Sequence, residues 1–153
     1  MTPTHPDVRD LQPEHPWAPG SWRPGDLGLR DSVGMTVALI VIALVRGYDY
    51  LTPYVPRTAG ATAIEDALPL WAWGVLFAAP AAVLTTGAVF RVHRLVWIGH
   101  GVLAVIYLAV TVGTTGEYLT HVWAAGIKGG FGLILPAYLH FTIAWRTGWT
   151  PPR

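Results

Sequence analysis

Cysteine is absent from this 153-residue sequence, and charged residues are scarce. Without cysteine the chain has no disulfide, no thiolate metal ligand and no cysteine nucleophile. Charged residues make up 12% of the chain, whereas soluble domains average about 25%. The net charge of +1 lacks the basic excess typical of nucleic-acid-binding domains. The composition therefore argues against nucleic acid as a partner.

Lysine and asparagine are rare or absent, and the common catalytic motifs are missing. Lysine occurs once, at Lys128, and asparagine does not occur. Because the codons of both residues are rich in A and T, this usage indicates a GC-rich genome, such as that of an actinobacterium or one of its phages. The sequence has no Walker A motif, no Rossmann fingerprint, no GxSxG and no HExxH. We therefore expect a non-enzymatic protein without a metal site.

Long apolar runs fill most of the chain, which is 52% hydrophobic with a mean hydropathy of +0.42. Each run has about 20 residues or more, enough to cross a hydrocarbon core of about 30 Å as a helix. The sequence predicts an all-α integral membrane protein, a four-helix antiparallel bundle that lies as a multi-pass protein in the cytoplasmic membrane. The N-terminal arm at 1–32 is expected to be extended or disordered and lacks the apolar core of a signal peptide. The transmembrane domain is expected at 33–146, with spans at 33–55, 68–90, 95–115 and 122–145. A short tail follows at 147–153.

Arginine positions predict the orientation. Cytoplasmic loops carry an excess of Lys and Arg. If the chain crosses four times, seven arginines fall on one side and two on the other. The larger group is Arg9, Arg23, Arg30, Arg91, Arg94, Arg146 and Arg153, and the smaller is Arg46 and Arg57. This asymmetry predicts that both termini lie in the cytoplasm.

Charged residues inside the predicted spans or just beyond their ends form a candidate polar cluster near the outer surface. Arg46 and Asp49 are three residues apart and share a helix face, so they can pair. Lys128 lies roughly 13 Å below the outer surface and needs an acidic partner, for which Asp49 and Glu117 are the candidates. The cluster has two interpretations, which are structural pairing with snorkelling or a polar cavity for an ion or ligand.

Two histidines are expected at the same depth. His100 lies six residues after Arg94, and His140 lies six residues before Arg146, on antiparallel helices. Both imidazoles should therefore sit about 9 Å inside the cytoplasmic surface. They could form a structural hydrogen bond, ligate a haem b iron or relay a proton. Small residues nearby would admit a porphyrin, namely Gly99, Gly101 and Ala137.

Small residues also predict helix packing. Gly126 and Gly130 form a GxxxG pair in the fourth span, a spacing that lets membrane helices approach closely. The pair could serve packing within one chain or self-association.

The pattern Leu70-Trp-Ala-Trp-Gly-Val and the stretch Val92–Val110, with Trp97-x-Gly-His100, resemble small four-span membrane proteins carried by actinobacterial phages. The resemblance covers about residues 36–145. It implies a lysis-related, holin-like or envelope-associated role, acting through the lipid bilayer by self-association or contact with another membrane protein. Two alternatives stay open: a haem b-binding membrane anchor using His100 and His140, and a small ion or proton carrier around Lys128 and Asp49.

Overall fold

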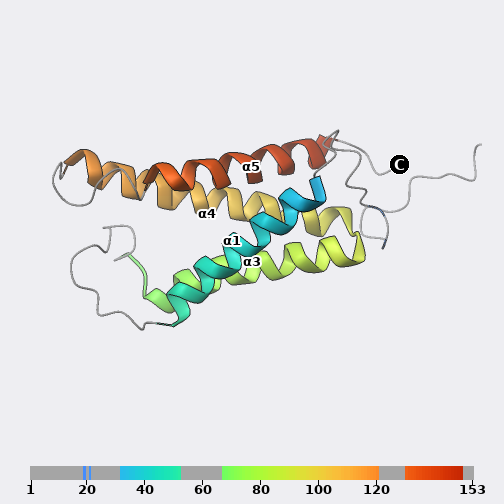
Figure 1. Ribbon diagram of the computed structural model, residues 1–153, viewed down its shortest axis with the longest axis horizontal. Helices are drawn as coiled ribbons and strands as arrows, with labels where there is room; N and C mark the ends of the chain where they lie inside the picture. Colours follow the sequence, from blue (N-terminus) through green and yellow to red (C-terminus); the bar gives the residue numbers. More distant parts are fainter. Residues whose placement is uncertain (1–18, 20, 22–31, 53–66, 121–129, 150–153) are drawn as a thin grey trace, which may run out of the picture.

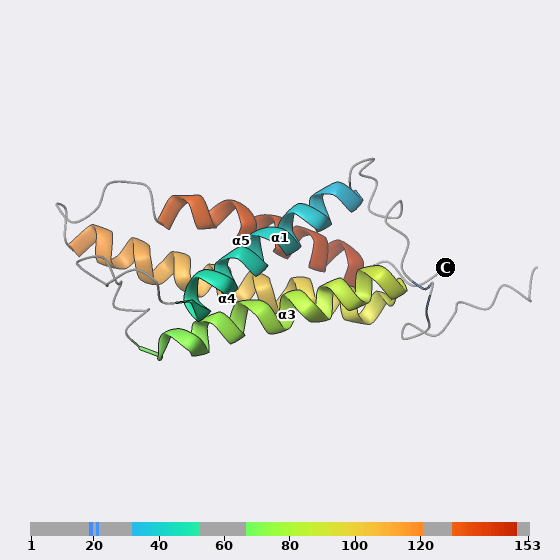
Figure 2. The same cartoon turned by 60° about the horizontal axis from the view of Figure 1, so that its bottom comes forward.

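The computed structural model describes residues 19, 21, 32–52, 67–120 and 130–149. This part of the chain contains four helices and no strand, so the all-α prediction is confirmed. The helices are α1 (Ser32–Leu51), α3 (Leu70–Phe90), α4 (His93–Thr120) and α5 (Gly130–Trp149). Successive helices run in opposite directions, and the α3–α4 turn lies at the same end as the start of α1 and the end of α5 (Figures 1 and 2).

The helix bounds differ from the apolar runs at several ends. α4 begins at His93 and ends at Thr120, beyond the predicted 95–115. α5 continues to Trp149, past the predicted end at residue 145. Hydropathy detects the apolar part of a helix, whereas helical hydrogen bonding continues into polar turns such as Glu117–Thr120 at the end of α4.

Three of the described helices are long and apolar enough to cross a membrane: Val33–Leu51, Leu70–Phe90 and His93–Gly116. Large apolar side chains are exposed on their surfaces, and Val105 of α4 is 68% exposed. Such surfaces suit lipid better than water. α5 has a similar length, but Pro136, His140 and Arg146 interrupt its apolar sequence. The described helices are therefore those of a small membrane protein.

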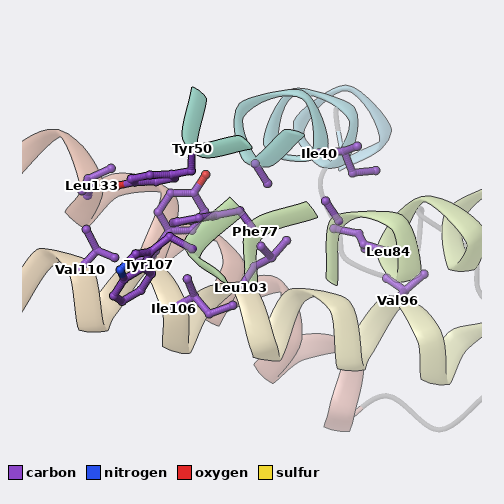
Figure 3. Packing of buried hydrophobic residues seen from close by; sticks show 14 residues of the cluster. Ile40, Tyr50, Phe77, Leu84, Val96, Leu103, Ile106, Tyr107, Val110 and Leu133 are labelled. Atoms are coloured by element: carbon purple, nitrogen blue, oxygen red, sulfur yellow. The ribbon is translucent and has the colours of Figure 1, made fainter. Parts of the chain in front are cut away.

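The helices pack around one main core. α3 contacts both α1 and α4, and α4 packs along α5. The core draws buried side chains from all four helices (Figure 3). Its larger members are Ile40, Tyr50, Trp73, Phe77, Leu84, Val96, Leu103, Ile106, Tyr107, Val110 and Leu133. A smaller cluster joins Leu39 of α1 to Ile143 of α5.

Glycines bring the helices close together at two crossings. A Cβ on Gly74 of α3 would lie 3.0 Å from the carbonyl oxygen of Gly47 in α1, and a Cβ on Gly99 of α4 would lie 2.6 Å from the Cβ of Leu84 in α3. Close backbone approach of this kind is how membrane helices gain van der Waals contact. The packing pair expected from the sequence is a different one. Gly126 lies outside the described residues and Gly130 is the first residue of α5, so packing through that pair stays a prediction.

The α3–α4 connection is a tight turn. Arg91 ends α3 in the left-handed conformation, with φ 53° and ψ 41°. The backbone N–H groups of Arg91 and Val92 both donate to the carbonyl of Gly87, the latter at 2.8 Å. These two hydrogen bonds cap the C-terminal end of α3, and α4 begins at His93, two residues after Arg91. The tight turn constrains how the first turns of α4 face α3.

Candidate functional site: a buried histidine pair

His100 of α4 and His140 of α5 form a hydrogen-bonded pair inside the protein. Their Nδ1 atoms lie 2.8 Å apart, and their ring centroids are 4.9 Å apart. Both side chains are fully buried, with 0% of their surface exposed. The antiparallel contact of α4 and α5 therefore places the two imidazoles at one level and turns them toward each other.

The protons of this pair follow from the chemistry of imidazole. A hydrogen bond between two Nδ1 atoms requires a proton on one of them, and each neutral ring carries one proton. The donating ring therefore has a bare lone pair on Nε2, whereas the accepting ring carries its proton on Nε2. Both Nε2 atoms are buried without a hydrogen-bond partner among the described residues. The pair thus offers one proton acceptor and one proton donor that no described group satisfies.

Aromatic rings form a wall on one side of the pair. Tyr107 stacks on His140 with ring centroids 5.6 Å apart and planes 17° apart. Phe77 contacts Tyr107 edge to face at 5.1 Å, and Tyr50 stacks on Phe77 at 5.9 Å. Figure 3 shows Tyr50, Phe77 and Tyr107 beside one another in the core. The buried hydroxyl of Tyr107 also has no hydrogen-bond partner among the described residues. Three buried polar atoms without a described hydrogen-bond partner therefore lie in neighbouring side chains: the Nε2 atoms of His100 and His140 and the hydroxyl oxygen of Tyr107.

The sequence positions these groups through a seven-residue spacing in α4. His93, His100, Tyr107 and Thr114 follow one another at this interval, which corresponds to about two helical turns. All four are buried or half-buried. They form a polar column on the inner face of a helix that is mostly apolar between Leu95 and Val110. Tyr107 was not among the residues expected from sequence, although the spacing that links His93 to His100 extends to it.

The geometry of the pair does not fit an iron ion held between the two Nδ1 atoms. Bonds from imidazole nitrogen to a metal are about 2.0 Å long, so two ligands on opposite sides of one ion need nitrogens about 4 Å apart. The observed 2.8 Å is shorter. Gly99 adds no free space, because Leu84 lies against it. Across the described ranges, no group of three or more His, Asp or Glu residues is placed to hold a metal.

The predicted outer cluster is described only in part. Arg46 is half-buried and Asp49 is exposed, and no ion pair joins them in this described stretch of α1. Lys128 lies outside the described residues, and Glu117 lies in α4 without a described side chain. The proposed pairing of Lys128 stays a prediction.

The comparisons with known proteins give no relative for this arrangement. No family model, no curated protein and no solved structure matches the chain.

Proposed function

We propose that this protein is a small, non-enzymatic integral membrane protein that relays protons through the His100–His140 pair. The observation that carries the proposal is the 2.8 Å Nδ1 contact between two fully buried imidazoles, each with an unpartnered Nε2 among the described residues. Ionisable side chains within membrane helices are costly and commonly mark proton or ion paths. Histidine suits this role because each of its two ring nitrogens can bind or release a proton.

The relay consists of three balanced proton transfers and no electron transfer. A proton first binds the bare Nε2 of the donating ring, which becomes an imidazolium. That ring then passes its Nδ1 proton across the 2.8 Å contact to the Nδ1 of the other ring. The second ring, now an imidazolium, releases its original proton from Nε2. One proton has entered and one has left, and the two rings have exchanged tautomers.

Access to the pair limits the rate of this relay. Both Nε2 atoms are buried, so water reaches them only when the packing around the pair opens. Reverse transfer restores the starting tautomers but cancels the net movement of the proton. For net flux in one direction, the Nδ1 contact must break and each ring must exchange its proton with water. Slow proton flux is therefore the expected behaviour, well below that of an open water-filled channel.

The relay fits the predicted topology of four crossings with both termini in the cytoplasm. α5 supplies the fourth crossing in this proposal. The α3–α4 turn with Arg91 and the end of α5 with Arg146 lie at one end of the molecule (Figure 1). Positive charges at that end are the pattern expected of a cytoplasmic face. The histidine pair then lies closer to the cytoplasmic surface than to the outer one.

The test is proton flux into liposomes that contain the purified protein and a pH-sensitive dye, driven by a potassium diffusion potential. The wild-type protein should acidify the lumen faster than empty liposomes, and His100→Ala and His140→Ala should abolish the difference. Phe141→Ala is the matched control, because Phe141 is adjacent to His140 in sequence but 56% exposed. Flux equal to that of empty liposomes, or flux unchanged in both histidine variants, would refute the relay.

A holin-like permeabiliser is the second candidate. Its support is the resemblance to small phage membrane proteins, together with exposed apolar side chains on all four helices, among them Val41, Val75, Val105 and Leu135. It would act by lateral self-association, with Arg46, Asp49 and Lys128 facing a neighbour or a lumen. The same liposomes distinguish it, because such a lesion would release a trapped fluorescent dye and would persist in the histidine variants. Lys128→Met should alter its timing.

A further inference from the structure

Ser21 lies far from α4 in the sequence but contacts its first residue. The backbone N–H of His93 donates to the Ser21 Oγ at 3.0 Å, and the Ser21 hydroxyl donates to the carbonyl of Arg91 at 3.4 Å. The Ser21 side chain is 5% exposed. One hydroxyl therefore bridges the two sides of the α3–α4 turn.

The contact gives a backbone N–H group at the start of α4 a hydrogen-bond acceptor. The first N–H groups of an α-helix have no partner within the helix, and a serine oxygen is among the best groups to accept from them. Such a cap normally comes from the residue just before the helix. That position in α4 is taken by Val92, which has no side-chain oxygen, and the left-handed Arg91 precedes it.

We propose that Ser21 is the docking point that holds the N-terminal arm against the α3–α4 turn and supplies α4 with its N-terminal cap. Docking also keeps His93, the first residue of the polar column, away from water, since its side chain is 8% exposed. This inference does not depend on proton relay, because it concerns the start of α4 and not the histidine pair. The interaction is within one chain, between the arm and the cytoplasmic hairpin of the predicted topology.

Thiol accessibility tests the docking directly, since the natural chain has no cysteine. Pro19 and Ser21 are two residues apart, and Pro19 is exposed while Ser21 is buried. With the full-length protein in nanodiscs, the thiol of Ser21→Cys should react with a water-soluble maleimide at least about tenfold more slowly than that of Pro19→Cys, because buried thiols are inert. Arg94→Cys is a second exposed reference at the start of α4, which leaves the backbone of the arm unchanged.

Hydrogen exchange provides the second measurement and covers the case in which cysteine itself disturbs the contact. Ser21→Ala should speed amide exchange in the peptide that contains His93 by about fivefold, the effect of losing a typical helix cap. Ser21→Thr should restore protection. Thr86→Ala is the control, because its hydroxyl bonds within α3, to the carbonyl of Ala82. Slow alkylation together with faster exchange supports the docking, whereas equal alkylation rates or unchanged exchange at His93 would overturn it.

Discussion

Gly99 of α4 lies directly against Leu84 of α3. A Cβ at residue 99 would come within 2.6 Å of the Leu84 Cβ, 2.9 Å of its Cα and 3.0 Å of its backbone nitrogen. Real side-chain atoms do not approach so closely, and two of these three atoms belong to the backbone, which cannot rotate away. The distance between α3 and α4 therefore depends on the absence of a side chain at this position, one residue before His100.

Gly99→Ala should destabilise the protein by about 1–3 kcal/mol, the usual cost of overpacking a filled interior. Gly101 provides a matched control, because nothing lies within 4 Å of a Cβ built there. Gly101→Ala should be neutral or stabilise by up to about 1 kcal/mol through helix propensity. Equilibrium unfolding in mixed micelles measures both. Equal effects of the two alanines would show that α3 and α4 do not meet at Gly99.

The hydrogen bond between His100 and His140 should appear as a coupling energy. Hydrogen bonds between membrane helices average about 0.6 kcal/mol in double-mutant cycles, with a maximum of about 1.7 kcal/mol. We expect a coupling within this range when His100→Ala, His140→Ala and the double variant are compared with the wild type. Strictly additive losses of stability would mean that the two side chains do not interact. The cycle reports the contact whether its role is structural or in proton transfer.

Tyr107→Phe should stabilise the protein by about 1 kcal/mol, because it removes a buried hydroxyl with no described partner and keeps the ring. The ring itself is needed, since Tyr107 stacks on His140 and contacts Phe77. Tyr107→Leu should therefore lose stability in the same unfolding assay. If Tyr107→Phe proves destabilising instead, the hydroxyl has a partner that stabilises the fold.

The protein purified from haem-supplied cells should show no Soret band, oxidised or dithionite-reduced. The reason is the 2.8 Å Nδ1 contact, which leaves no space for an iron between the rings. Visible absorption spectroscopy measures this, and a haem-binding protein of similar size serves as the positive control. A Soret band that shifts on reduction and disappears in His100→Ala or His140→Ala would contradict the expectation and restore the haem anchor.

The apolar runs made the helices predictable, because a membrane helix must satisfy its backbone internally and expose apolar side chains to lipid. The ends of the helices were harder to predict than their centres. α4 shows why, because polar residues extend it at both ends, to His93 and to Thr120, beyond its apolar sequence. The equal depth of His100 and His140 followed from counting residues from the flanking arginines. Whether their rings face each other depends on the rotation of α4 and α5 about their axes. That rotation is set by side-chain packing between the helices, which a single sequence does not reveal.

The contact between Ser21 and His93 had no signal in the sequence. Capping signals are local patterns, in which a serine stands immediately before a helix. Here the cap is 72 residues away. Its existence depends on how the chain before α1 returns to the α3–α4 turn, which is a property of the tertiary structure.

Several threonines of the helices use their hydroxyls within their own helix, as Thr111 does toward the carbonyl of Tyr107 at 2.7 Å and Thr142 toward that of Tyr138 at 2.8 Å. Such bonds move with the helix and do not oppose sliding along a neighbour. The His100–His140 bond is different, because it joins two helices and is directional. A slip of one turn, about 5.4 Å, would break it completely. The pair thus adds a directional constraint on the axial register of α4 and α5 to the side-chain packing between them, and a variant that lacks the pair loses this constraint.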